Sequence, residues 1–199
     1  MKKIFILFFF TLIIKDSSSQ ESFGDCIKNT WAHMDSLVKL GKNPLTVWKD
    51  CIIGKQMPDL NAVTLTGDTI QMNKLKGKIV VINFWFIGCH PCIAEMPALN
   101  KLAEEYKNKD VVFYAITWET AKRIHDDFLS KYKLDLIIVP DAQKLISNLI
   151  GNGGYPMTYI IDRQGIIKEA WGGGRTDSLA VKEYYETAKP FINDLLKAK

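Results

Sequence analysis

The sequence predicts an α/β domain, in which a mixed central sheet has helices on both faces and follows a helical extension. From about residue 57 onward, apolar runs typical of buried strands alternate with segments of helical periodicity. The last two predicted strands are joined by a tight turn, which adds an antiparallel hairpin to the parallel strands. The length of 199 residues and the hydrophobic content of 47% suit one domain with a modest extension.

The first 19 residues have the order of a secretory signal peptide. Two lysines precede the apolar run 4–14, and small residues follow it up to Ser19. The run is shorter than the roughly 20 apolar residues that cross a bilayer as a helix. We therefore expect cleavage before Gln20 and export across the inner membrane, to a periplasmic location where disulfides persist. A membrane tether formed by an uncleaved N-terminus is the alternative.

The charge of the chain gives no sign of a nucleic-acid partner. Residues 1–19 carry three lysines and one aspartate, so the formal net charge falls from +4 to +2 without them. A nucleic-acid-binding domain of this kind would carry a clustered basic surface. We expect no such basic surface on this protein and therefore no nucleic-acid partner.

Residues 20–56 form the predicted helical extension. Apolar residues recur at steps of three and four in its first half, which predicts an amphipathic helix. They are Ile27, Trp31, Met34, Leu37 and Val38. Gly41 and Pro44 break this pattern, and a second apolar stretch leads to Ile52.

Cys26 and Cys51 lie in this extension, and export favours a structural disulfide between them. The loop-entropy model gives such a bridge roughly 3 kcal/mol. The two cysteines would be too far apart for this bond in a plain helical hairpin that turns near Gly41. Cys26 would then lie about 21 Å from the turn, and Cys51 about 9 Å. Bridged Cα atoms lie within about 7 Å. Free buried cysteines or a second exchange-active pair therefore remain as alternatives.

Residues 57–199 form the predicted sheet domain. The nearly continuous apolar run 78–86 is typical of a strand covered on both faces. The turn at 162–165 joins the last two strands as a hairpin. The predicted strands are 60–65, 69–70, 78–86, 111–116, 136–139, 157–161 and 166–171. The predicted helices are 92–106, 119–132, 141–150 and 177–197.

Cys89-His90-Pro91-Cys92 stands where the first buried strand gives way to its helix. Two thiols three positions apart can close a small disulfide, and a helix N-terminus stabilises a thiolate. We expect the outer residue, Cys89, to be the nucleophile and Cys92 to resolve the mixed disulfide. A protonated His90 would favour the Cys89 thiolate, and Pro91 suits a first helical turn because it has no N–H.

Two other kinds of cysteine site fit the sequence less well. A zinc site needs two further ligands, and Cys26 and Cys51 do not form a close second pair. A peroxidase of the peroxiredoxin kind would place a proline and a threonine at the positions of Ile82 and Phe86. We therefore expect no metal.

The run from Asn83 to Pro97, NFWFIGCHPCIAEMP, together with Tyr155-Pro156-Met157-Thr158 and the turn 162–165, resembles the TlpA and ResA type of secreted thiol-disulfide oxidoreductase. The resemblance covers about residues 55–175. It implies a thioredoxin-like fold, protein disulfides as substrates, the reducing direction and no organic cofactor. It also implies electrons from a membrane thiol carrier and a link to cytochrome c maturation.

The resemblance also implies roles for single residues. Pro156 would be a cis proline that faces the disulfide, and Tyr155 would offer its backbone to an extended substrate. From the residues alone, a trans proline that opens a strand fits equally well. Glu95 would relay protons to Cys92, whereas the residues alone favour a solvated glutamate. Trp85 would pack beneath the disulfide, as a core tryptophan also would.

The sequence departs from the family pattern at two positions. Asn83 stands where ordinary thioredoxins carry a buried aspartate, which leaves Glu95 as the nearest candidate proton carrier. Gly88 stands where a tryptophan often precedes the first cysteine, so an aromatic part of the docking surface is missing. The competing hypothesis is a non-catalytic thioredoxin-fold binding module, or a protein that binds copper or zinc through the same cysteine pair.

Overall fold

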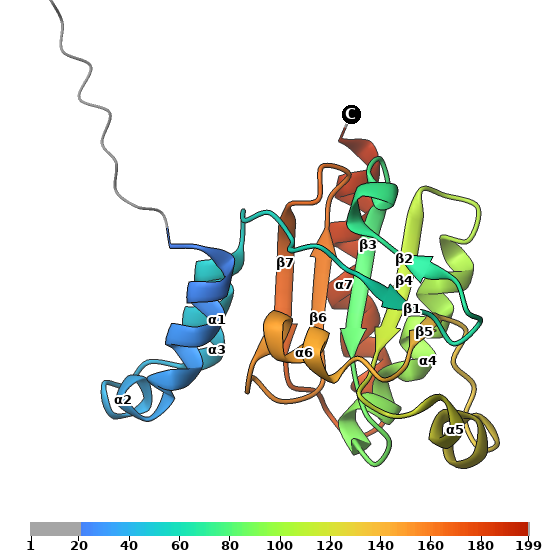
Figure 1. The fold of residues 1–199 in the computed structure, drawn as a ribbon, viewed down its shortest axis with the longest axis horizontal. Coiled ribbons are helices and arrows are strands. Elements are labelled where there is room, and N and C mark those ends of the chain that lie inside the picture. The colour runs from blue at the N-terminus through green and yellow to red at the C-terminus, as the bar shows by residue number, and fades with distance from the viewer. Residues whose placement is uncertain (1–20, 199) are drawn as a thin grey trace, which may run out of the picture.

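The computed structural model describes residues 21–198, which form a five-stranded mixed sheet with helices on both faces (Figure 1). The strand order is β5-β4-β3-β6-β7. Strands β3, β4 and β5 are parallel, and β6 and β7 run antiparallel to their neighbours. The predicted fold class is confirmed. The predicted signal peptide over residues 1–19 lies outside the described residues.

The strands follow the predicted order closely. They are β1 (Ala62–Val63), β2 (Thr69–Ile70), β3 (Ile79–Phe84), β4 (Val111–Ile116), β5 (Ile137–Val139), β6 (Met157–Ile161) and β7 (Ile167–Gly172). The first strand is shorter than the predicted 60–65, and it pairs only with β2 in a separate two-stranded sheet. Every residue of β3 is buried, as its apolar run predicts.

The helices cover the sheet from both sides. They are α1 (Phe23–Ala32), α2 (Met34–Lys39), α3 (Pro44–Ile52), α4 (His90–Glu105), α5 (Ala121–Arg123), α6 (Gln143–Ile150) and α7 (Ala180–Lys197), with a 3-10 turn η1 (Met72–Leu75). The predicted single helix over 119–132 was wrong: only three residues are α-helical, and they continue as the π-helix η2 (Ile124–Leu129). Thr120 caps this segment, because its hydroxyl accepts the Arg123 N–H.

The two faces of the sheet have separate hydrophobic clusters. Alternate residues of β3 point to opposite faces. Val80, Ile82 and Phe84 join the cluster that α6 and the extension cover. Ile79 and Val81 join the cluster that α4 and α7 cover. Within residues 21–198, no helix is both long and apolar enough to cross a membrane.

The extension packs α1 and α3 side by side next to β7 and α6, with α2 at their far end (Figure 1). Trp48 is fully buried and stacks on Tyr159 of β6, with ring centroids 5.7 Å apart. The hydroxyl of Tyr159 donates to the Leu149 carbonyl at 2.6 Å. Lys49 pairs with Glu169 of β7 at 2.5 Å. The extension therefore completes one face of the core.

Cys26 and Cys51 are joined by a disulfide, with their Cα atoms 5.7 Å apart. The objection to this bond assumed one helix that runs as far as Gly41. Instead, α1 ends at Ala32, and His33 has non-helical backbone angles. Cys26 thus lies six residues before the end of α1, and Cys51 lies seven residues after the start of α3. With a rise of about 1.5 Å per residue, the two cysteines therefore lie at nearly the same height along the paired helices α1 and α3.

We predict that the double change Cys26→Ala/Cys51→Ala lowers the free energy of unfolding by about 3 kcal/mol, because a closed loop of this length restricts the unfolded chain. Urea denaturation without reductant measures the loss. Adding a reductant should bring the wild type close to the variant. Equal denaturation midpoints for the two oxidised proteins would show that the bond does not brace the fold.

Candidate active site

Cys89 and Cys92 form a disulfide at the N-terminus of α4, with their Cα atoms 5.3 Å apart. Cys89 is the N-cap residue, and its sulfur accepts the Cys92 N–H at 3.3 Å. Cys89 is 6% exposed, whereas Cys92 is 0% exposed. Of the two cysteines, only Cys89 therefore has any surface exposed toward another molecule.

Gly88 turns the chain immediately before Cys89. Its φ of +91° lies in the left-handed region, which any residue with a side chain adopts at a cost. Nothing lies within 4 Å of the place where a Cβ would stand, so the backbone angle and not a collision favours glycine. This gives a physical reason why no tryptophan precedes Cys89.

The Tyr155–Pro156 peptide bond is cis, as the family resemblance implies. Pro156 is buried at the start of β6, and Tyr155 is half-buried. Gly174, in the loop after β7, closes the site from a third side. A Cβ at Gly174 would lie 3.1 Å from Pro156 Cγ, 3.3 Å from Pro91 Cβ and 3.3 Å from Glu95 Oε2. The cysteine helix, the cis proline and this loop therefore meet at one point.

Glu95 is buried one turn of α4 beyond Cys92. The interpretation of Glu95 as a solvated glutamate, which the residues alone favour, was therefore wrong. The Asn83 amide donates to Glu95 Oε1 at 2.8 Å and to the Thr158 hydroxyl at 3.2 Å. The hydroxyls of Thr158 and Tyr184 lie 3.1 Å apart. Burial raises the pKa of Glu95 from its ordinary value of 4.5 to about 8, although the Asn83 hydrogen bond works against this rise.

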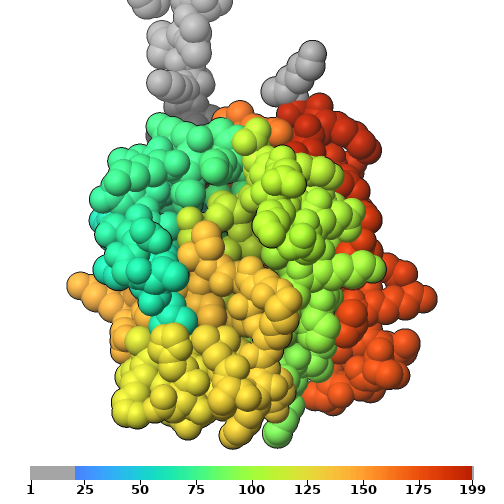
Figure 2. Space-filling model, turned by 90° about the vertical axis from the view of Figure 1, so that its right-hand side faces the viewer, coloured from blue at the N-terminus to red at the C-terminus, as the bar shows by residue number. Residues whose placement is uncertain are grey.

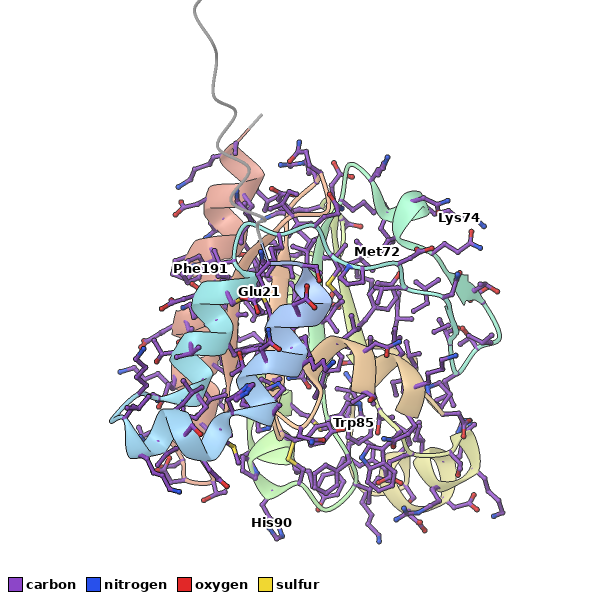
Figure 3. The ribbon with its side chains drawn as sticks, turned by 60° about the vertical axis from the view of Figure 1, so that its left-hand side comes forward. Glu21, Met72, Lys74, Trp85, His90 and Phe191 are labelled. Carbon is purple, nitrogen blue, oxygen red and sulfur yellow. A yellow bond between two sulfur atoms is a disulfide. The ribbon has the colours of Figure 1, made fainter. Side chains whose placement is uncertain are left out.

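The remaining predicted site residues lie around the disulfide, as Figure 3 shows for Trp85 and His90. Trp85 is fully buried in the same hydrophobic cluster as both cysteines, and its ring lies 4.5 Å from that of Phe128. His90 is exposed, and Pro91 is half-buried. His90 occupies the first position of α4, next to Cys89.

Residues 53–170 match the family model described as the AhpC/TSA family. The chain belongs to the AhpC/TSA family. It is 34% identical over 124 residues to the thiol-disulfide oxidoreductase ResA of Bacillus anthracis, which is 62% of this chain and 72% of the relative. It is 36% identical over 126 residues to the thioredoxin-like protein YneN of Bacillus subtilis, which is 62% of this chain and 73% of the relative.

Solved structures show the same fold. A putative thiol:disulfide interchange protein DsbE from Chlorobium tepidum has a TM-score of 0.62 and 24% identity, over 72% of this chain and 97% of the other. The thioredoxin domain of a thiol-disulfide oxidoreductase from Bacteroides vulgatus has a TM-score of 0.57 and 27% identity, over 71% and 98%. The ResA relatives show that the protein is a thiol-disulfide oxidoreductase, and the solved structures show that its fold is thioredoxin-like.

The extension, most of which lies outside the family match, packs against the loop that leads to the cis proline. Trp31 of α1 lies on Gly151 and Gly153, where a Cβ would come within 2.7 Å and 2.6 Å of its ring. Leu45 of α3 lies on Gly172, where a Cβ would come within 2.9 Å. Glycines at these positions therefore let the extension pack closely on the loop before the cis proline and on the end of β7.

Sequence reasoning missed Glu119, which is 1% exposed in the segment after β4. Its Oε1 accepts the Ile87 N–H at 3.0 Å, and its Oε2 pairs with Arg123 at 2.5 Å. The carboxylate thus ties the loop before Cys89 to the segment after β4. A glutamate one residue before the Thr120 cap was the available signal, but it resembled an ordinary surface residue.

The sulfur atoms of Cys26 and Cys51 lie within 4.8 Å of a Glu21 carboxylate oxygen, and no other such group of three potential metal ligands occurs in residues 21–198. Both sulfurs are bonded to each other. The second ligand pair that a zinc site at Cys89 and Cys92 would need is therefore not placed beside them in this part of the chain.

We predict that Glu95→Gln removes a pH dependence of stability. Because the folded protein keeps a proton that the unfolded chain releases, the stability due to neutral Glu95 is complete below its ordinary pKa of 4.5 and is lost as the pH rises to about 8. In this window, the free energy of unfolding of the wild type should fall relative to the variant by up to roughly 1.4 kcal/mol per pH unit. Urea denaturation of both oxidised proteins across the window measures it, and parallel curves would disprove the raised pKa.

Proposed function

We propose that this protein is exported and reduces disulfides of other proteins by dithiol exchange through Cys89 and Cys92. One observation carries the proposal: a disulfide stands at the N-terminus of α4, has only its outer residue, Cys89, partly exposed and lies near the cis Tyr155–Pro156 bond. Helix N-terminal N–H groups lower the pKa of a cysteine thiol, which favours the thiolate needed for attack.

The first step forms a mixed disulfide. The thiolate of reduced Cys89 attacks one sulfur of the substrate disulfide, and the substrate S–S bond breaks. The second substrate sulfur leaves as a thiolate and takes a proton from solvent. During this step the Tyr155 backbone holds the extended substrate chain, while Pro156 and Pro91 flank the sulfur atoms.

The second step releases the product. The Cys92 thiol gives its proton to Glu95, and its sulfur attacks Cys89 as the bond from Cys89 to the substrate breaks. The substrate leaves as a second thiolate, so two electrons have passed from the cysteine pair to the substrate. The Cys89–Cys92 disulfide that remains is the state seen in the structure. With a pKa of about 8, Glu95 is present in both protonation states near neutral pH, and it can return the proton to Cys92 on re-reduction.

The reducing direction of electron flow and the location outside the cytoplasm are proposed from the resemblance to the TlpA and ResA group. A membrane thiol carrier would supply the electrons outside the cytoplasm, after export directed by residues 1–19. The activity would then serve cytochrome c maturation. The exchange needs no organic cofactor, because both electrons reside on the two sulfurs.

Insulin reduction tests the cysteine roles. Cys89→Ser should abolish turnover, because the attacking thiolate is lost. Cys92→Ser should trap the mixed disulfide between Cys89 and its substrate, which non-reducing electrophoresis detects. Cys26→Ala/Cys51→Ala should retain turnover. Equal inactivity of wild type and Cys89→Ser, with copper or zinc bound at the cysteine pair, would favour a binding protein instead.

The reduction potential of the Cys89–Cys92 pair tests the direction of electron flow. We expect a value near about −270 mV, as in thioredoxin. Alkylation at a series of glutathione or dithiothreitol potentials, followed by mass spectrometry, measures this pair separately from Cys26 and Cys51. A value near about −120 mV would mark an oxidant that makes disulfides, and the proposed role in reduction would be lost.

A further inference from the structure

Three aromatic side chains from three different loops meet beside Cys89. Phe86 precedes α4, Trp118 follows β4, and Tyr155 precedes the cis proline. The rings of Phe86 and Trp118 are stacked, with centroids 5.8 Å apart and an angle of 27° between them. The ring of Tyr155 meets Phe86 edge-on, with centroids 5.2 Å apart. The Phe86 carbonyl accepts the Cys89 N–H at 3.2 Å, and the side chains of Phe86 and Tyr155 pack against the hydrophobic cluster that contains both cysteines.

Trp118 is exposed although the backbone on both sides of it is firmly held. It is 37% exposed, while its neighbours Thr117 and Glu119 are 0% and 1% exposed. The Thr117 N–H donates to the Val139 carbonyl at 2.9 Å, and the Asp141 N–H donates to the Glu119 carbonyl at 2.9 Å. A large aromatic ring held in place at the surface is a common anchor in protein recognition.

The Glu119 carboxylate fixes the stacked pair. Because it accepts the Ile87 N–H, it ties the residue after Phe86 to the residue after Trp118. Its partner Arg123 also pairs with Asp127 at 3.4 Å. In addition, Lys122 pairs with Asp126. Both cations that follow Trp118, Lys122 and Arg123, are therefore already engaged by carboxylates, so neither is free to attract an acidic side chain to the ring face.

The same end of the molecule carries both the cysteine helix and this segment. Figure 2 shows the segment after β4, in yellow, at the lower end of the molecule, where the start of α4, in green, also lies. An extended chain that passes Tyr155 with its cysteine at Cys89 would place a neighbouring side chain on the Phe86–Trp118 face.

We propose that Trp118, stacked on Phe86, is a docking site for an apolar side chain next to the attacked cysteine of a substrate protein. The proposal rests on the function proposed above and adds a substrate class to it. The partner is an extended segment of a disulfide-containing protein with a leucine-like or aromatic residue beside its cysteine. Burial of that side chain on the two rings provides the selectivity.

Two disulfide peptides of equal length and charge test the proposal, one with leucine and one with serine next to the reactive cysteine. The wild type should favour the leucine peptide by about tenfold in kcat/KM. Trp118→Ala should lose this preference, and Trp118→Phe should largely retain it. A small aromatic-free disulfide, cystamine, should be reduced equally by all three proteins, because it does not reach the ring face.

Phe191→Ala is the matched control. Phe191 is 38% exposed, but it lies on α7, far from His90 (Figure 3). It should leave the peptide preference unchanged. An unchanged preference in Trp118→Ala, or an equal loss in both alanine variants, would overturn the docking site while cystamine reduction continues. Failure of the wild type to reduce cystamine or either peptide would instead overturn the proposed function, and the docking site with it.

Discussion

The antiparallel pairing of β3 with β6 is the constraint on which the site depends. It places Phe84, at the end of β3, opposite Met157, at the start of β6. The chain leaving β3 leads to Cys89, and the chain entering β6 comes from Pro156. The two halves of the site therefore meet because one buried strand lies at the centre of the sheet. A shift of this register by one residue would move the proline away from the disulfide and turn every side chain of β6 to the opposite face of the sheet.

Much of this arrangement could be predicted from local patterns. The apolar run of β3 and the cysteine pair that follows it are both local signals, so their junction was predictable. The helix break at His33 could not be predicted, because the sequence around it resembles a continuing helix. The Cys26–Cys51 bond was therefore left undecided. Glu119 could not be assigned at all, since its partner, the Ile87 N–H, comes from a distant loop.

Glu95 shows how a polar residue can be buried beside a redox pair. Neutral Glu95 needs less solvation than its carboxylate, and the Asn83 amide satisfies one of its oxygens. Asn83, Thr158 and Tyr184 continue the hydrogen-bonded line across the sheet to α7. Burial raises the pKa of Tyr184 well above its ordinary value, so its hydroxyl remains neutral. The acid beside Cys92 thus belongs to a network that carries no fixed charge of its own.

The contact of Trp31 with Gly151 and Gly153 means that the segment matched to the family and the packed structure of this chain have different boundaries. A protein cut at residue 53 would contain the entire AhpC/TSA match, including both reactive cysteines and the cis proline. It would nevertheless lack Trp31, which packs on Gly151 and Gly153 in the loop that leads to that proline. A related domain grafted in place of residues 53–170 would therefore need glycine at the positions of Gly151 and Gly153 to accept the Trp31 ring.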